Sequence, residues 1–181
     1  INNSDTLYSL NLELEKDANV RVGIINNLDS KNHVFTANIA QNSTISFNIA
    51  DFNSGKSTFR IDSHLLGDNA KCYCHVATSS DNKDFKNFII NIYHENKDTV
   101  SKVECYGVSK GESQLIFSGI SHIKNGCIKS NTNQIAKAMV FDPSSIAIAK
   151  PILKIDENDV IASHSAAVGK INDEHLFYLM S

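Results

Sequence analysis

The feature that most constrains this 181-residue chain is an alternation of apolar and polar side chains with a period of two. Leucines alternate with Asn and Glu over residues 10–14, and the same pattern recurs over 20–24 and 45–49. Further runs of this kind occupy residues 58–61, 71–77, 87–93, 103–108, 115–123 and 145–155. In an extended chain, alternation sends every second side chain to one face, so these runs predict strands that rest on a core.

Clusters of Asn, Asp, Ser, Lys and Gly separate the runs and predict turns. Only the segment 172–181 predicts a helix, because Asn172 can cap it and Ile171 and Leu176 are spaced as a hydrophobic staple. Many short strands without helical crossovers favour a sandwich, a barrel or a β-solenoid. The alternation alone therefore predicts an all-β single domain and leaves these three architectures open, although no crisp repeat supports a solenoid.

The composition argues against several classes of function. A hydrophobic fraction of 41% and a charged fraction of 20% are typical of a globular protein. The net charge of -3, without a basic stripe, argues against nucleic-acid binding. No apolar run approaches the roughly 20 residues of a membrane span, and the polar start has neither a signal peptide nor an initiator Met. We therefore expect a cytoplasmic fragment of a longer protein, with its four cysteines as free thiols.

The stretch Gly55-Lys56-Ser57-Thr58 resembles the end of a phosphate-binding P-loop. That loop requires a glycine where this chain has Ala50, and it must open a helix. The residues that follow have the pattern of a strand, so we interpret the stretch as a turn.

Two cysteines, Cys72 and Cys74, lie two residues apart and are followed by His75, which suggests a metal site. A strand places both thiols on one face and the imidazole on the other, whereas a zinc site favours C-x-x-C spacing and a second ligand pair. The pattern favours buried core residues. Cys105 and Cys127 are isolated in sequence and are likewise interpreted as packing residues.

The tripeptide Ser163-His164-Ser165 places hydroxyls beside an imidazole. Nucleophilic catalysis is disfavoured, because no G-x-S-x-G motif is present and neighbours on a strand point apart. Neutral imidazole is also a good iron ligand. From the residues alone, His164 is interpreted as a surface or interface histidine.

The C-terminal end carries a longer pattern in fixed register, which reads PILKI from Pro151, then DV, SHSA, G and finally DEHLFYLMS. This pattern resembles the signature of the SufB/SufD family of iron–sulfur cluster assembly proteins. Weaker landmarks upstream are Leu65-Leu66-Gly67, His94 with Thr99 and Ser101, and Phe117-Ser118-Gly119-Ile120. The resemblance covers about residues 57–181.

The resemblance implies a right-handed parallel β-helix as a core domain over residues 1–171, with 172–181 as the start of a truncated C-terminal helical segment. It implies a non-catalytic scaffold subunit of the SUF complex that pairs with a SufB-like paralogue. Family members also form homodimers. In the family the C-terminal helical part contacts a SufC-like ATPase, and that contact region would be largely missing here.

SufB-like members of the family place acidic residues around the motif histidine and carry an upstream cysteine that helps to form the nascent cluster. Alignment on Pro151 and His164 puts that cysteine at Ala136, and the flanking residues are Ser163 and Ser165. Alanine cannot ligate iron, so the resemblance favours a SufD-like subunit, although Ser165 stands where the family commonly has Gly. His164 is then a candidate cluster ligand or interface residue between two interface serines. Any cluster would be transient and shared with a partner, and none is expected on the isolated fragment.

Two other classes of protein compete with the scaffold. A β-helix polysaccharide lyase or hydrolase needs clustered carboxylates and aromatic platforms, and the absence of Trp with only 8% aromatic residues argues against it. The other rival is a self-assembling β-solenoid without partner chemistry. Co-purification with a SufC-like ATPase or a SufB-like paralogue would separate that rival from the scaffold.

Overall fold

The computed structural model describes residues 6–26 and 31–170, and within these ranges it contains twelve strands and no helix. The strands are β1 (Thr6–Leu14), β2 (Asn19–Asn26), β3 (Lys31–Ile39), β4 (Thr44–Asp51), β5 (Lys56–Leu65), β6 (Lys71–Ser80), β7 (Phe85–His94), β8 (Val100–Ser109), β9 (Gln114–Ile123), β10 (Asn131–Val140), β11 (Ile146–Ile155) and β12 (Ile161–Lys170). The helix expected over 172–181 lies outside the described residues.

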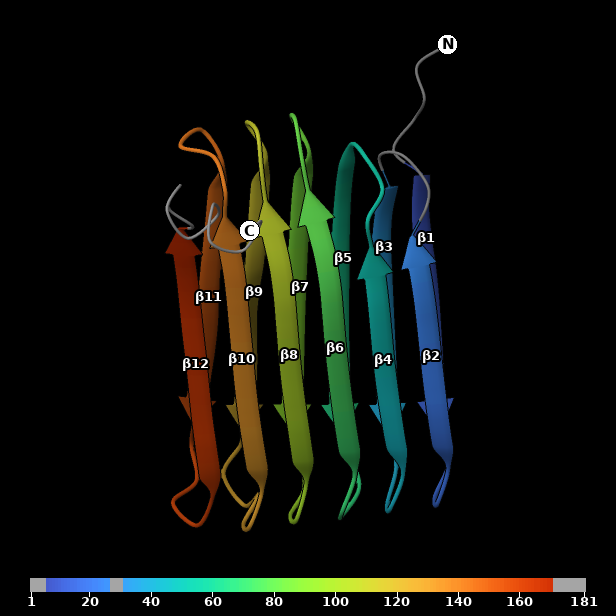
Figure 1. The fold of residues 1–181 in the computed structure, drawn as a ribbon. Coiled ribbons are helices and arrows are strands. Elements are labelled where there is room, and N and C mark those ends of the chain that lie inside the picture. Colours follow the sequence, from blue (N-terminus) through green and yellow to red (C-terminus); the bar gives the residue numbers. More distant parts are fainter. Residues whose placement is uncertain (1–5, 27–30, 171–181) are drawn as a thin grey trace, which may run out of the picture.

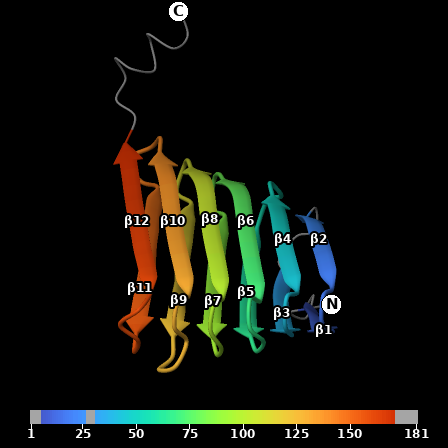
Figure 2. The same cartoon turned by 90° about the horizontal axis from the view of Figure 1, so that it is seen from below.

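The strands form two parallel six-stranded sheets, one of odd-numbered and one of even-numbered strands. Each odd strand is followed by an even strand in the opposite sheet, so that one pair makes a coil and the coils stack side by side (Figure 1). Figure 2 shows the two sheets as two layers, with β11 and β12 at one end of the stack and β1 and β2 at the other. The chain is therefore a parallel β-solenoid of about six coils, and the expected all-β β-helix is confirmed.

The core lies between the sheets. It consists of the side chains at the inward-facing positions of each alternating run. Phe59, Phe88 and Phe117 occupy one register position on successive odd strands, and their ring centroids are 5.3 and 5.6 Å apart. His33 continues this ladder toward the N-terminal end and stacks on Phe59 at 4.2 Å. Toward the C-terminal end the ladder stops at Ala149. Stacked aromatic rings of this kind hold neighbouring coils in register.

The nine alternating runs coincide with strands, whereas β3, β10 and β12 lie outside these runs. In β10 the inward positions hold Thr132, Gln134, Ala136 and Ala138, all of which are buried. Small and polar residues at inward positions hide an apolar period of two, which is why the strand was missed.

Five of the six described turns from odd to even strands, all except the one between β11 and β12, share one backbone conformation. Their left-handed residues, with φ between 57° and 63°, are Asp17, Asn42, Asn69, Asp98 and Lys129. Asn and Asp tolerate this conformation better than other non-glycine residues. The turns also stack, because the Asn42 amide donates to Asp17 at 2.9 Å and the Asn69 amide donates to Asn42 at 3.2 Å. Of the P-loop-like stretch, only Gly55 lies in a turn, with φ 98°; its other three residues begin β5 at Lys56, so no helix follows as a P-loop requires.

The two sheets approach each other most closely in the last coil, where β11 and β12 contact each other along their length. The register places Ala147 and Ala149 of β11, and Ala162 and Ala166 of β12, on the inward side. Because these side chains are small, nothing holds the sheets apart as the phenylalanines do in the middle coils. The solenoid therefore tapers toward its C-terminal end.

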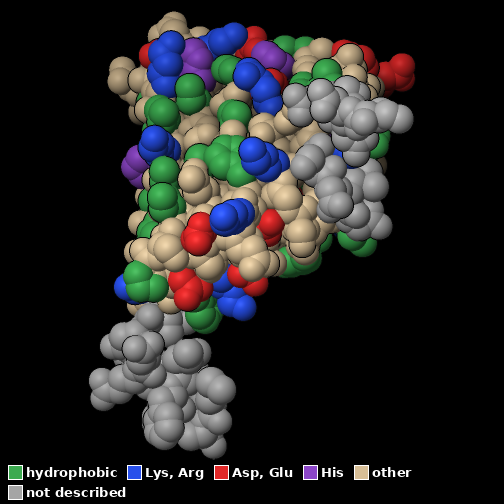
Figure 3. All heavy atoms as spheres, turned by 90° about the horizontal axis from the view of Figure 1, so that it is seen from above, with side chains coloured by type: hydrophobic (Ala, Val, Ile, Leu, Met, Phe, Trp, Pro, Cys, Tyr) green, Lys and Arg blue, Asp and Glu red, His purple; other side chains and the backbone are tan. Residues whose placement is uncertain are grey.

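The surface mixes charges of both signs. Figure 3 looks onto the turns that follow the even strands, where Lys and Arg lie among Asp and Glu. This agrees with the absence of a basic stripe from the sequence. Across residues 6–26 and 31–170 no helix has the length and apolar character required to cross a membrane.

Candidate functional site

His164 lies in the middle of β12, at the open end of the even sheet. Within the described part of the chain β12 pairs only with β10, and β11 pairs only with β9. His164 is in register with Gln134, whereas Ser163 and Ser165 are in register with Asn133 and Ile135. The three predicted interface residues are therefore on an edge strand.

The register decides the direction of each side chain. Gln134 is buried between the sheets, so His164 occupies an inward-facing position, yet it is exposed because the described chain adds no coil beyond it. Ser163 occupies the outer face, where its hydroxyl accepts a 2.7 Å hydrogen bond from the Asn133 amide. The imidazole and the hydroxyls consequently point to opposite faces, which removes the arrangement that nucleophilic catalysis would need.

The last coil also carries an exposed apolar set. Its members, with their exposed fractions, are Ile146 (46%), Ile152 (50%), Ile155 (37%), Ile161 (65%) and Val168 (48%). Hydrophobic side chains recur along the left edge of Figure 3, the side on which the stack ends. The register places Ile146 and Ile152 on the outer face of the odd sheet and Ile161 on the outer face of the even sheet, so the set flanks the free strand edges on both sides. Exposed apolar groups beside unpaired strand edges are typical of a protein-binding surface.

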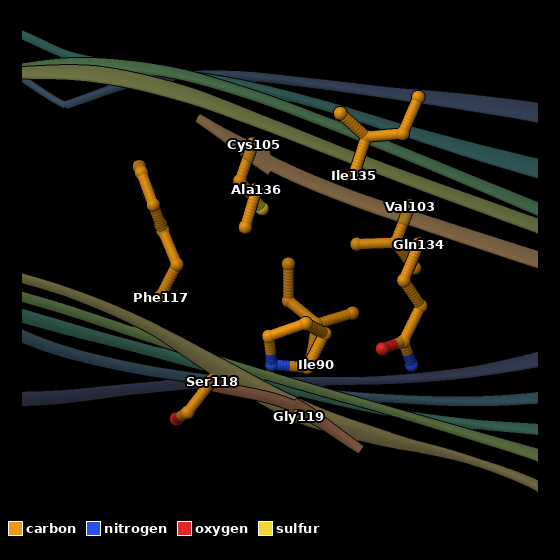
Figure 4. A pocket seen from close by; sticks show the side chains of 10 residues that line it. Ile90, Val103, Cys105, Phe117, Ser118, Gly119, Gln134, Ile135 and Ala136 are labelled. Carbon is orange, nitrogen blue, oxygen red and sulfur yellow. The ribbon is translucent and has the colours of Figure 1, made fainter. Parts of the chain in front are cut away.

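A cavity of about 20 Å³ lies between the sheets beneath the last coil. Figure 4 shows Ile90, Val103 and Phe117 pointing into it, together with Gln134. The Gln134 Nε2 donates to the Ser121 hydroxyl at 2.6 Å, and its Oε1 has no hydrogen-bond partner among the described residues. A space of this size holds about one water molecule and no metal cluster.

Ala136 also lines this cavity. It stands where the resemblance to SufB-like proteins would place a cysteine, so the inner wall offers no thiolate there.

The thiols are buried in the core, as predicted. Burial raises the pKa of Cys72 and of Cys105 to about 12 and raises that of Cys74 as well. Protonated thiols are poor metal ligands. Cys127 donates its Sγ hydrogen to the carbonyl of His94 at 3.2 Å. Within residues 6–26 and 31–170, no three His, Cys, Asp or Glu side chains are grouped to hold a metal ion.

The landmark residues His94, Thr99 and Ser101 meet in a buried polar network. His94 Nδ1 is 2.7 Å from the Thr99 hydroxyl, and Nε2 is 2.9 Å from the Ser101 hydroxyl. The network continues to Ser130 and Thr132 in the next coil, each at 2.7 Å. Burial, followed by the nearby His122, lowers the pKa of His94 to about 4, so the ring is neutral at pH 7. The network links two neighbouring coils, and its side chains are buried away from solvent.

A buried ion pair between Lys86 and Asp51 was not predicted. Both side chains are fully buried, with Nζ and Oδ1 2.8 Å apart, and Lys86 also donates to the Asn53 carbonyl at 2.8 Å. Asp51 accepts a further hydrogen bond from Ser57. The ion pair connects strand β7 to the turn between β4 and β5. The sequence signal was available, because Lys86 occupies an inward position of the β7 alternation.

Comparison with known proteins agrees with this geometry. Residues 4–181 match the family described as SUF system FeS cluster assembly, SufBD core domain. The chain belongs to the SufB/SufD family. It is 28% identical to the iron–sulfur cluster assembly protein SufD of Bacillus subtilis over its whole length, which is 43% of that protein. The SufD-like character inferred from Ala136 and the flanking serines agrees with this match.

Two other SufBD family proteins match part of the chain. One, from Mycobacterium leprae, is 30% identical over 49% of this chain and 10% of its own length. Another, from Staphylococcus epidermidis, is 25% identical over 65% of this chain and 25% of its own length. The chain thus spans less than half the length of these SufB/SufD relatives.

Proposed function

We propose that this chain is the core of a non-catalytic, SufD-like scaffold subunit that acts in the cytoplasm with a SufB-like paralogue and a SufC-like ATPase. The observation that carries this proposal is the open last coil, where free strand edges, an exposed apolar set and His164 occur together. Family membership supplies the context of iron–sulfur cluster assembly.

Pairing would occur through β11 and β12. Their outer edges present N–H and C=O groups that a second sheet can bind, and the exposed isoleucines would be buried at the same joint. The pair would be a heterodimer with the paralogue, or a homodimer of this subunit. With either partner, burial of the exposed apolar set would contribute most of the favourable free energy of association.

The cluster itself would be cargo held at the joint. His164 would supply a nitrogen ligand or a hydrogen bond, with Ser163 and Ser165 beside it on the interface. The thiolates would come from the partner, because Cys72, Cys74 and Cys105 of this chain are buried and protonated.

The proposal includes two features of the architecture. The coils would wind right-handed, as parallel crossover connections almost always do. Residues 1–171 would form the core domain, and 172–181 would begin a C-terminal helical segment whose continuation contacts the ATPase. This short chain alone would therefore bind the ATPase poorly.

The His164→Ala variant of the full-length protein tests the role of the imidazole. We expect normal folding and a lowered yield of cluster when the assembled complex is reconstituted anaerobically and followed by optical absorption. His75→Ala, a partly exposed histidine on the outer face of the same sheet, is the control. Wild-type yield in His164→Ala would remove the functional assignment of this residue.

The pairing surface is tested separately by Ile161→Lys. The charge should abolish co-purification with the paralogue, whereas Ile25→Lys, 83% exposed at the opposite end of the stack, should not. Failure of the wild-type full-length protein to retain either partner would instead favour a self-assembling solenoid.

A further inference from the structure

The outer face of the even sheet has an apolar hollow that extends from the edge strand β12 toward β6. The residues that line it are Phe52, Ala77, Thr78, Tyr106, Gly107, Val108, Lys137, Ala138, Met139, Ala167 and Gly169. Alanine and glycine form much of its floor, and Phe52, Tyr106 and Met139 stand exposed around it. An apolar depression bounded by large exposed side chains is typical of a docking site.

The chain leaves the last strand beside this hollow. All even strands run in the same direction, so their C-terminal ends lie at one end of the molecule (Figure 1). Gly169, the penultimate residue of β12, itself lines the hollow. A segment that continues from Lys170 therefore starts at its rim.

The segment that follows matches the hollow in length. A helix over 172–181 would be about 15 Å long at 1.5 Å per residue. Three spacings between neighbouring strands come to roughly 14 Å. Such a helix would span from β12 across β10 and β8 to β6, the strands that supply most of the lining.

The segment also matches the hollow in chemistry. Leu176, Phe177 and Met180 fall along one side of the predicted helix, and Asp173 and Glu174 fall in its first turn. The charged residue of the lining is Lys137 on β10, the first strand that the helix would cross. The acidic turn would thus meet the lysine, and the apolar side would meet Tyr106 and Met139.

We propose that residues 172–181 dock as a helix across the outer face of the even sheet, with their apolar side in this hollow. The docked helix fixes the direction in which the rest of the protein leaves the solenoid. It also covers apolar surface on the outer face of the sheet and leaves the backbone edge of β12 free for pairing. Docking requires neither a cluster nor a partner, so its failure would leave the proposed scaffold function untouched.

Amide hydrogen exchange on the 181-residue chain tests the docking. Amides of residues 174–181 should exchange at least about tenfold more slowly than in a free peptide of the same sequence. Tyr106→Glu and Met139→Glu should restore the peptide rate, while Tyr73→Glu, on the outer face of β6 but outside the hollow, should not. Unchanged exchange in β5 to β8 would show that the variants fold.

Three results would overturn the proposal: peptide-like exchange in the wild type, protection that survives both glutamate variants, or protection that disappears on dilution, which would assign the hollow to a second copy. Disulfide trapping gives an independent measurement. Met139→Cys with Phe177→Cys should cross-link within one chain, whereas Tyr73→Cys with Phe177→Cys should not. The native thiols do not compete, because all four are buried.

Discussion

Gly119 shows how closely neighbouring strands approach beneath the last coil. A Cβ atom at this position would lie 1.8 Å from the carbonyl oxygen of Ile90, which is backbone and cannot move aside as a flexible side chain can. Around this point the Asn91 side chain enters the sheet, where its Oδ1 accepts from the Ile120 amide at 3.3 Å. The glycine is therefore required by close approach of two strands.

We expect Gly119→Ala to lower the free energy of unfolding by about 1–3 kcal/mol or more, because the backbone must shift to admit the methyl group. Gly23→Ala is the matched control, since a Cβ there meets nothing within 4 Å. Its effect should stay within about 0.5 kcal/mol. Urea unfolding of both variants checks this, and equal stabilities would contradict the argument.

His94 should make stability depend on pH. Its pKa is about 4 in the folded chain, against an ordinary value of 6.5 in the unfolded chain. Between these values the unfolded chain binds more protons, so stability falls as the pH drops from 6.5 to 4. The total loss should be about 3 kcal/mol.

The variant His94→Gln isolates this contribution. It should be less stable than the wild type at pH 7, because the buried hydroxyl network loses a partner, but its stability should depend less on pH between 6.5 and 4. Urea unfolding at several pH values provides the measurement. Parallel curves for the two proteins would show that His94 does not titrate in this way.

For single residues, the alternation in the sequence predicts the face of the strand on which each side chain lies. The parity of Cys72 and Cys74 placed them correctly on the core face, and His75 on the opposite face. Lys86 was missed because a fully buried lysine is rare without a partner, and Asp51 lies in another strand. The spacing of residues along one strand predicts which face of the sheet each side chain occupies. It does not predict which residue of another coil that side chain contacts.

Among the turns, Lys129 is the residue that fits its conformation least. Its φ of 59° is the same as in the other odd-to-even turns, where Asn or Asp stands. The left-handed region costs a lysine about 1 kcal/mol or more, and it costs glycine little. The packing around the turn between β9 and β10 must therefore offset this backbone cost.

We expect Lys129→Gly to raise the free energy of unfolding by up to about 1 kcal/mol. Lys16→Gly, next to the left-handed Asp17 and without a positive φ of its own, should lower it by a similar amount. Thermal unfolding of both variants distinguishes them. A loss of stability in Lys129→Gly would mean that the lysine side chain contributes more than its backbone costs.

The strands were predictable wherever large apolar residues mark the inward positions. The architecture was not, because coil length varies: Thr6 pairs with Lys31, whereas Gln114 pairs with Ile146. A variable coil leaves no fixed period in the sequence. Recognition of the C-terminal pattern, and not the alternation, was what favoured a solenoid over a sandwich or barrel.

For the whole molecule, a stack of coils predicts a gradient of protection, because each coil contacts only its neighbours. Cys72, Cys74 and Cys105 lie in the middle coils and should react with iodoacetamide at least about a thousandfold more slowly than in the unfolded chain. Ile25→Cys, 83% exposed in β2, should react at the rate of a free thiol. Fast labelling of the native thiols would contradict a continuous core.

The candidate site was predictable only in part. The pattern from Pro151 onward identified His164, and its placement on an edge strand agrees with an interface residue, although its role stays a prediction. The exposed apolar set of the last coil was not predicted, since Ile161 and Val168 have the composition of core residues. Val168 occupies an inward position that no further described coil covers, and Ile161 faces outward in register with Asn131, neither of which the local sequence encodes.

The taper gives the two ends of the described stack different shapes, which bears on the proposed pairing. Two narrow ends match each other in width, whereas the first coil, with Tyr8 stacked on His33, is kept wide by aromatic rings. A head-to-tail joint would leave gaps that a tail-to-tail joint does not. In the pairing proposed above, small alanines at the joint would favour a closed pair over continued growth into a fibre.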